Sequence, residues 1–153
     1  DTYNASPLAV EAALETLYSA TAPHRVAVLG SMNELGDMSV TAHGEIGHMC
    51  DPSRLDWLVT IGEEAKAYLA PAAESKGCQV RTFTSPYEAG GFVRSIAKPG
   101  TVILVKGSQN GVFAEETVKT LLHDSADEEQ LVRQSSHWLD VKQAAFDKTT
   151  PVE

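Results

Sequence analysis

Residues 106–111 combine a lysine, two glycines and several polar side chains. The segment reads Lys-Gly-Ser-Gln-Asn-Gly and directly follows an apolar run at residues 101–105. Lys106 supplies a cation, Ser108 supplies a hydroxyl, and Gly107 lets backbone N–H groups approach a ligand closely. This combination predicts a site for a carboxylate or a phosphate. The alternative is a glycine-rich turn that carries a solvated lysine.

A second polar loop, residues 30–36, also follows an apolar run. It reads Gly-Ser-Met-Asn-Glu-Leu-Gly, which does not fit the Gly-x-Gly-x-x-Gly pattern of dinucleotide sites. The sequence also contains no Gly-Lys-Ser/Thr, so it has no P-loop. Any nucleotide chemistry would therefore need phosphate-binding residues from elsewhere. The alternative is a strand that ends at Gly30, followed by a turn that closes at Gly36.

The histidines and cysteines form no metal-binding pattern. His43 and His48 are five residues apart and would point in different directions on a helix, and no His-Glu-x-x-His occurs. Cys50 and Cys78 lack the spacing of a metal pair, and we expect them to stay reduced in the cytoplasm. No Gly-x-Ser-x-Gly motif supports a serine hydrolase. The sequence therefore predicts neither a metal site nor a hydrolase triad.

The elements that must position the two polar loops alternate along the chain. Short apolar runs predict strands at residues 25–30, 55–62, 79–83 and 101–107. Helical periodicity predicts helices at residues 7–20, 38–50, 63–75, 87–97 and 113–123. This alternation predicts a single α/β domain with a Rossmann-like, doubly wound, mostly parallel sheet and helices on both faces. In such a sheet, ligands bind beyond the carboxyl ends of the strands, where both polar loops lie.

The predicted elements differ in polarity. Residues 101–107 form the most clearly buried strand, whereas residues 79–83 are more polar and suit an edge of the sheet. After residue 123 the chain continues as an acidic loop and then as an amphipathic turn around residues 138–146. Ser6 and Pro7 suit the N-cap and first position of the first helix.

Length and charge exclude several classes of protein. The 153 residues correspond to about one domain, and the formal net charge of −9 argues against nucleic acid or an anionic membrane as the main partner. No apolar run reaches the roughly 20 residues that span a bilayer. The chain starts at Asp1 without methionine and enters a motif at once, so we expect it to be part of a longer protein.

Four segments resemble the C-terminal domain of the Mur ligases. Residues 1–7, Asp-Thr-Tyr-Asn-Ala-Ser-Pro, are similar to the start of that domain. Residues 29–36 resemble its Leu-Gly-Asp-Met-x-Glu-Leu-Gly, and residues 43–47 resemble its His-x-x-(Ile/Val)-Gly. Residues 105–108 resemble the first four positions of its Val-Lys-Gly-Ser-Arg. The likeness is strongest to the Mur ligases that add D-Ala-D-Ala to a UDP-N-acetylmuramoyl tripeptide.

The resemblance implies a cytoplasmic bacterial enzyme of peptidoglycan precursor synthesis. Residues 1–153 would form its C-terminal domain, while the N-terminal domain and the central P-loop domain would lie outside this chain. The whole enzyme would use ATP and Mg²⁺, bound mainly by the central domain. ATP would convert the carboxylate of the UDP-muramoyl peptide into an acyl phosphate, which the amine of D-Ala-D-Ala attacks. The chain alone is expected to be inactive and to hold no catalytic residue.

The resemblance also implies roles for particular residues. Two residues would contact ATP: Asp1 and Asn4. The expected substrate-binding residues come from three segments: Lys106, Gly107, Ser108, Asn33, Glu34 and His43.

Two departures from the family pattern leave the acceptor open. Ser31 stands where the resembled motif has aspartate, and Gln109 stands where it has arginine. An arginine grips a carboxylate with two parallel hydrogen bonds, whereas glutamine offers a weaker, neutral contact. A sister ligase that adds a different amino acid, of another Mur or folylpolyglutamate type, is therefore an alternative. A non-catalytic, flavodoxin-like binding module is an alternative of another class.

Overall fold

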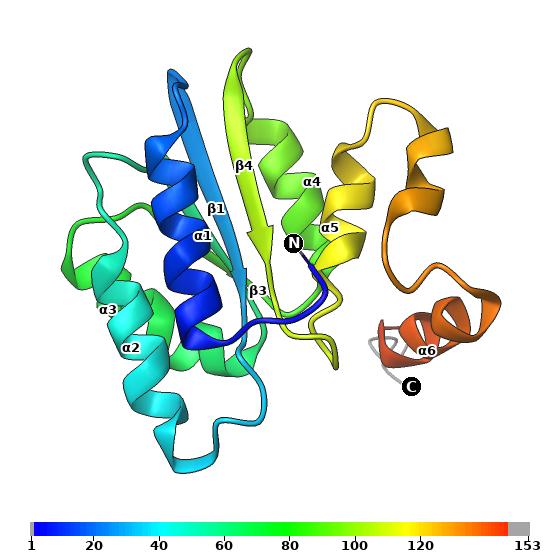
Figure 1. Ribbon diagram of the computed structural model, residues 1–153, viewed down its shortest axis with the longest axis horizontal. Coiled ribbons are helices and arrows are strands. Elements are labelled where there is room, and N and C mark those ends of the chain that lie inside the picture. The colour runs from blue at the N-terminus through cyan, green and yellow to red at the C-terminus, as the bar shows by residue number, and fades with distance from the viewer. Residues whose placement is uncertain (1, 147–153) are drawn as a thin grey trace, which may run out of the picture.

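A parallel sheet of four strands forms the centre of the molecule (Figure 1). The computed structural model describes residues 2–146. The strands are β1 (His24–Gly30), β2 (Trp57–Ile61), β3 (Val80–Phe83) and β4 (Thr101–Lys106). Their order is β3-β2-β1-β4, so the chain moves outward from β1 to β3 and then places β4 on the other side of β1. The predicted doubly wound α/β fold is confirmed.

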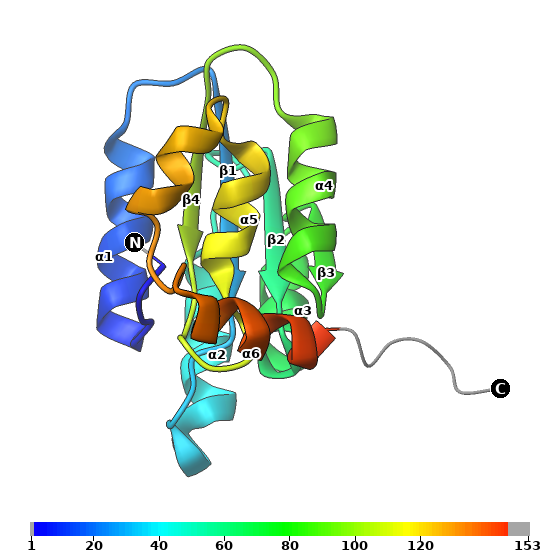
Figure 2. The ribbon, with the colours of Figure 1, turned by 90° about the vertical axis from the view of Figure 1, so that its right-hand side faces the viewer.

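Helices cover both faces of the sheet (Figure 1). One face carries α1, α2 and α3, and the other carries α4 and α5. Figure 2 shows α6 lying across the end of the molecule at which the strands finish. The bounds of the helices are α1 (Pro7–Ser19), α2 (Ser39–Met49), α3 (Ala70–Ser75), α4 (Pro86–Ile96), α5 (Ala114–Leu121) and α6 (Ser136–Phe146). None of these described helices is both long and apolar enough to span a membrane.

The sheet separates two apolar cores, because successive residues of a strand point to opposite faces. On β1, Ala27 and Leu29 pack with the helices α1 to α3, while Val26 and Val28 pack with α4 and α5. All four side chains are at most 2% exposed. A strand that is covered on both faces has a continuous run of apolar residues, and this run is why β1 could be predicted from the sequence.

Serine followed by proline starts two of the helices. The Ser6 hydroxyl accepts a hydrogen bond from the N–H of Ala9, and Pro7 occupies the first turn of α1. Ser85 caps α4 in the same way and is followed by Pro86. The serine oxygen satisfies an N–H that has no partner inside the helix, and proline has no N–H to leave unsatisfied. The predicted cap at Ser6 is confirmed.

The expectation that residues 101–107 form the most buried strand is wrong. β4 is an edge strand, and Val102 is 38% exposed. An apolar run reports how much hydrophobic surface a strand offers, but not whether a neighbouring strand covers its side. The expectation that residues 79–83 form an edge strand is confirmed, since β3 closes the opposite side of the sheet.

The helix predicted at residues 63–75 contains a wide turn. Residues 65–69 form a π-helical segment, and α3 follows from Ala70 to Ser75. Pro71 has no N–H to bond the carbonyl of Ala67, and its ring crowds that carbonyl. We attribute the widened turn to this proline.

The tail after α5 is more ordered than the predicted acidic loop. Asp124 caps a short 3₁₀ helix, Ser125–Gln130, by accepting from the N–H of Ala126 at 2.9 Å. The predicted amphipathic turn is the helix α6. Its residues Trp138 and Phe146 make edge-to-face contacts with Phe113, which precedes α5.

Candidate functional site

The order of the strands reverses between β1 and β4. In doubly wound sheets, this reversal opens a crevice at the carboxyl ends of the two strands, and ligands bind there. The polar loop after β1 and the polar loop after β4 both start at this edge, since Leu29 pairs with Lys106. The fold therefore brings together the two loops that the sequence singled out.

Glycines allow the two strand ends to approach each other. A Cβ atom on Gly107 would lie 2.7 Å from the Val112 side chain and 3.3 Å from the Cα of Gly30. A Cβ on Gly30 would meet the same valine. Gly107 was expected to allow close approach to a ligand. The structure gives it a packing role against β1 and Val112.

Residues 2–6 form a segment that crosses this edge of the sheet, here named the N-terminal strap. The Lys106 ammonium donates to the carbonyl of Asn4 at 2.9 Å. The Ser108 hydroxyl lies 3.4 Å from the carbonyl of Ala5, as its donor, and accepts from the N–H of Asn33 at 2.8 Å. Both Lys106 and Ser108 are at most 2% exposed. These two side chains therefore join β4, the strap and the loop after β1.

Burial acts on the charge of Lys106. Removal of water from the ammonium lowers the pKa of Lys106 below its ordinary value. The carbonyl of Asn4 supplies part of the solvation that water would have given. Lys106 thus stabilises the position of the strap directly.

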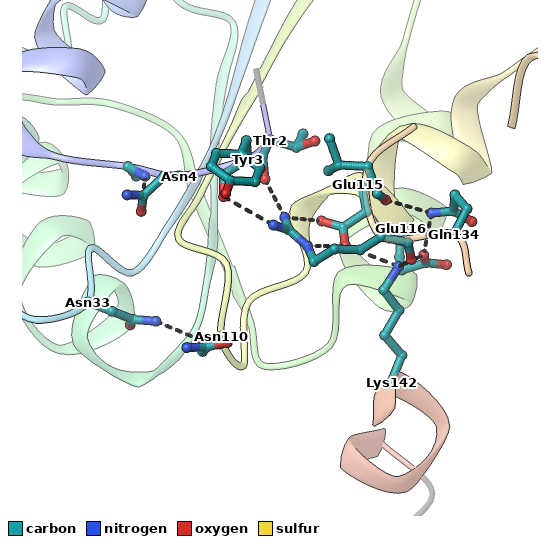
Figure 3. A network of polar contacts seen from close by, with 12 residues as sticks. Thr2, Tyr3, Asn4, Asn33, Asn110, Glu115, Glu116, Gln134 and Lys142 are labelled. Carbon is teal, nitrogen blue, oxygen red and sulfur yellow. Dashed lines mark hydrogen bonds and ion pairs between the residues drawn. The ribbon is translucent and has the colours of Figure 1, made fainter. Parts of the chain in front are cut away.

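A polar cavity of about 200 Å³ lies between the strap and the two loops. Its lining residues come from all three segments: Asn4, Ala5, Ser6, Asn33, Glu34, Leu35, Ser108, Gln109 and Asn110. We call this cavity the strap pocket. The Asn33 amide donates to the carbonyl of Asn110 at 2.7 Å and so ties the two loops together (Figure 3).

The strap pocket offers hydrogen bonds more than charge. Among its described lining residues, amide and hydroxyl side chains predominate, and Glu34 is the only one that ionises. Glu34 is exposed and has a left-handed backbone conformation, with φ of 64°. A site of this kind suits a polar ligand that has amide, amine or hydroxyl groups. It suits the phosphates of a nucleotide less well, because the lining has no cation.

Asn4, one of the two residues expected to contact ATP, lines the strap pocket. It is exposed on the strap, and its side-chain oxygen accepts from the N–H of Ala5 at 2.8 Å. Asp1, the other residue expected to contact ATP, lies outside the described residues. Within residues 2–146, no group of three or more His, Cys, Asp or Glu side chains is placed to hold a metal ion.

His43 lies behind the loop and has no exposed surface. Its Nε2 accepts from the N–H of Met32 at 2.9 Å, so the proton of the neutral ring is on Nδ1, which lies 2.8 Å from the carbonyl of Ser39. The Ser39 hydroxyl in turn donates to Glu64 at 2.8 Å. The geometry makes His43 a support for the loop that carries Asn33.

A set of buried charges that the sequence did not predict lies beside the strap (Figure 3). Arg133 forms two hydrogen bonds of 2.8 Å to the carboxylate of Glu115. Lys142 bonds Glu116 at 2.6 Å. The four residues are at most 9% exposed. The adjacent glutamates in the first turn of α5 were a visible signal, since carboxylates favour helix N-termini, but no spacing rule identifies their partners.

Comparison with known proteins gives consistent results. The family described as "Mur ligase, glutamate ligase domain" matches residues 1–109. A UDP-N-acetylmuramoyl-tripeptide–D-alanyl-D-alanine ligase of Bacillus subtilis (strain 168) is 34% identical over 125 residues, which cover 80% of this chain and 27% of that protein. The enzyme of the same name from Synechocystis is 30% identical, covering 82% and 27%. The chain thus spans about a quarter of the length of these relatives.

Solved structures agree with the sequence relatives. The MurF ligase from Thermotoga maritima in complex with ADP matches with a TM-score of 0.65 and 28% identity, over 85% of this chain and 28% of that one. A MurF from Acinetobacter baumannii matches with a TM-score of 0.64 and 25% identity, over 86% and 27%.

Proposed function

This chain belongs to the Mur ligase family, as a glutamate ligase domain, and from this premise we propose that it is the C-terminal domain of an ATP-dependent ligase of peptidoglycan precursor synthesis. The proposed reaction joins D-Ala-D-Ala to a UDP-N-acetylmuramoyl tripeptide. Residues 1–153 would form one domain, and the N-terminal and central domains would come from residues outside this chain. Flavodoxin-like binding, the alternative of another class, is disfavoured by the family match.

The strap pocket is the observation that carries this proposal. It lies at the reversal of strand order, and its walls come from the segments in which the family motifs were found. Two residues that line it are joined by a hydrogen bond, from the N–H of Asn33 to the hydroxyl of Ser108 at 2.8 Å. This bond holds the pocket in shape without a ligand. Such preorganisation lowers the entropy cost of positioning a small substrate for attack.

Each residue of the site has a proposed task. Asn4 offers its amide to the ribose or base of ATP, and Asn33, Glu34 and Ser108 line the place of the incoming dipeptide. Glu34 can attract the dipeptide's ammonium group, since its carboxylate is exposed at the pocket. ATP supplies a phosphate that makes the tripeptide carboxylate reactive toward an amine. This chain's part is to bind, to orient and to exclude water.

The cofactors and the compartment form part of the same proposal. ATP and Mg²⁺ would be held mainly by the central domain, because the described lining of the strap pocket has no cation for the phosphates. Cys50 and Cys78 are both buried and unpaired, which agrees with a reducing cytoplasm. No binding to nucleic acid and no membrane insertion are expected.

A ligase assay on the whole gene product tests the proposal. The polypeptide with the residues that precede Asp1 is expected to release phosphate from ATP only when the UDP-tripeptide and D-Ala-D-Ala are both present. Replacing Lys106 by methionine should lower kcat/KM about 100-fold, since the strap loses its anchor. The control K66M changes an exposed lysine and should leave kcat/KM unchanged. Phosphate release that ignores both substrates would refute the ligase function.

A different acceptor is the second candidate. Gln109 lines the strap pocket at the position where the family motif has arginine, so a carboxylate there would lack its usual two-point contact. A screen of single amino acids against D-Ala-D-Ala separates the two functions. A higher kcat/KM for one amino acid would favour a sister ligase of another Mur or folylpolyglutamate type.

A further inference from the structure

Arg133 faces two groups at once. One edge of its guanidinium, through Nε and one terminal nitrogen, holds both oxygens of Glu115. The terminal nitrogens also donate to the carbonyl of Thr2 at 2.6 Å and to that of Tyr3 at 3.1 Å. The planar fork of arginine allows this double contact, which the single ammonium of lysine would not reproduce. Arg133 therefore connects Glu115 of α5 to the N-terminal strap.

Lys142, on α6, fixes Arg133 in turn. Its ammonium donates to the Arg133 carbonyl at 2.7 Å and contacts Glu115 at 3.0 Å and Glu116 at 2.6 Å. Arg133 has a left-handed backbone, with φ of 57°, which is unfavourable for a residue with a Cβ. A conformation of this kind persists where the surroundings determine it, and the bond from Lys142 is part of those surroundings.

The charges of this cluster balance, with two carboxylates and two cations. All four are buried, and burying an ion pair costs about as much desolvation free energy as its attraction returns. The cluster is therefore a weak source of net stability. Its directional bonds instead determine where residues 2 and 3 lie.

The bonds to the strap form a continuous series. Arg133 donates hydrogen bonds to the carbonyls of Thr2 and Tyr3, and Lys106 donates one to the carbonyl of Asn4. Ser108 contacts the next carbonyl, that of Ala5. Four consecutive carbonyls of the strap are thus held by side chains, half of them by a residue of the tail. The strap forms one wall of the strap pocket through Asn4, Ala5 and Ser6.

We propose that Arg133 is a positioning residue, which holds the N-terminal strap in place and thereby shapes the wall of the strap pocket that Asn4 provides. Arg133 lies beyond residues 1–109, the region matched by the family. The tail of this chain would therefore complete a site whose other residues come from the family region. The effect on catalysis rests on the proposed ligase function, whereas the effect on the strap does not.

Nuclear magnetic resonance relaxation on the 153-residue chain tests the effect on the strap. The double variant E115Q/R133Q removes one charge of each sign, so that neither partner is left buried and unpaired. Backbone order parameters at residues 3–5 are expected to fall from about 0.85 to below about 0.6, while those of the strands stay unchanged. The control R94Q alters an exposed arginine on α4 and should leave the strap rigid.

A second variant keeps the test decisive if the double variant does not fold. R133K keeps the charge beside Glu115 but cannot bond two carboxylate oxygens and two carbonyls together. It should also loosen residues 3–5 in a folded chain. Wild-type order parameters at residues 3–5 in either folded variant would overturn the proposal.

Kinetics of the whole gene product test the effect on the site. A misplaced wall should raise the KM for ATP or for D-Ala-D-Ala on the order of tenfold in R133K, with a smaller change in kcat. A purely structural role would lower kcat with the folded fraction and leave both KM values unchanged, which would refute a positioning role. If the wild-type enzyme makes no ligation product, the ligase function fails, and the relaxation result still decides whether Arg133 orders the strap.

Discussion

The hydroxyl of Ser31 takes part in the start of a helix to which Ser31 does not belong. It accepts from the N–H of Ala65 at 3.1 Å, in the first turn of the helix that begins at residue 63. The backbone N–H of Ser31 bonds the carbonyl of Ile61 at 2.9 Å, which fixes the hydroxyl in place. Ser31 therefore acts as an N-cap from the loop that follows β1. Aspartate, expected at this position in the family, has an oxygen that can do the same.

Removal of this cap should cost stability. Ser31→Ala leaves a buried N–H without its acceptor, so the free energy of unfolding should fall by about 1 kcal/mol, measured by urea denaturation. Ser95→Ala is the control, because the Ser95 hydroxyl bonds a carbonyl within its own helix at an exposed position and should change stability by less than about 0.5 kcal/mol. Equal midpoints for S31A and wild type would contradict the capping role.

At the level of single residues, the sequence indicated which loops carry the candidate site residues, but it did not indicate what each side chain contacts. Lys106 and Ser108 were predicted as binding residues because of their residue types and their position at the end of a strand. Their contacts with the strap join residues 102 and 103 positions apart, and no local pattern reports such a distance. Their roles in substrate binding stay predictions, as do those of Asn33 and Glu34.

Helix α2 explains the motif at residues 43–47, for which the sequence alone indicated no structural role. Three residues of His-Gly-Glu-Ile-Gly, at 43–47, point inward: His43 supports the loop after β1, and Ile46 is in the core. Gly47 lies against the following helix, where an added Cβ would meet the backbone oxygen of Leu69 and come within 2.6 Å of the Cβ of Ala72. The motif therefore maintains the packing of two helices and the position of a loop.

The two glycines of this helix should respond oppositely to alanine. Gly47→Ala forces the two helices apart and should lower the free energy of unfolding by about 1–3 kcal/mol. Gly44→Ala is the matched control, because its Cβ would have nothing within 4 Å, and the gain in helix propensity should stabilise the chain by up to about 1 kcal/mol. Urea midpoints measure both changes. A stabilised G47A would show that the helices do not meet as described.

At the level of elements, periodicity located every strand and the five principal helices of the sheet. Strands covered on both faces are continuous apolar runs, and Ser6 with Pro7 marked the start of α1. The same pair at Ser85 and Pro86 was not used to predict the start of α4. The error at β4 arose because the run of Thr101–Lys106 is as apolar as that of a central strand. Whether a strand has one neighbour or two depends on the path of the whole chain, and the sequence of the strand does not report it.

The fold of the whole molecule depends on contacts that the sequence could not show. The cluster of Glu115, Glu116, Arg133 and Lys142 joins α5, the tail and α6. Buried charged side chains are rare, so the sequence predicts that each of these residues lies on the surface. Their ion-pair partners lie 18 to 27 positions away, beyond any helical spacing.

Acid should weaken the native chain through this cluster. Burial raises the pKa of Glu115, but hydrogen bonds from Arg133 and Lys142 and the charge of Lys142 outweigh that effect and leave the pKa below its ordinary value of 4.5. A lowered pKa stabilises the folded state above the unfolded value, and this contribution is lost as pH falls through the folded value. Stability should therefore fall from about pH 4.5 downward.

The variant E115Q/R133Q provides the comparison. Its free energy of unfolding should depend less steeply on pH below pH 4.5 than that of the wild type, measured by urea denaturation at a series of pH values. Other carboxylates whose pKa is lowered, such as Asp51 and Asp56, act in both proteins, so their effect cancels in the difference. Parallel pH profiles would show that the native state does not hold Glu115 as an ion.

The reach of Arg133 back to Thr2 and Tyr3 also sets an order of events during synthesis. These contacts join residues 131 and 130 positions apart, so a ribosome releases residues 2 and 3 long before their partner exists. At about 5–20 residues per second, the delay is on the order of ten seconds. Sheet and helices can assemble in that interval, and Lys106 can already hold the carbonyl of Asn4, but the carbonyls of Thr2 and Tyr3 still lack their partner. A nascent chain stopped after β4 would have its scaffold and lack a finished binding wall.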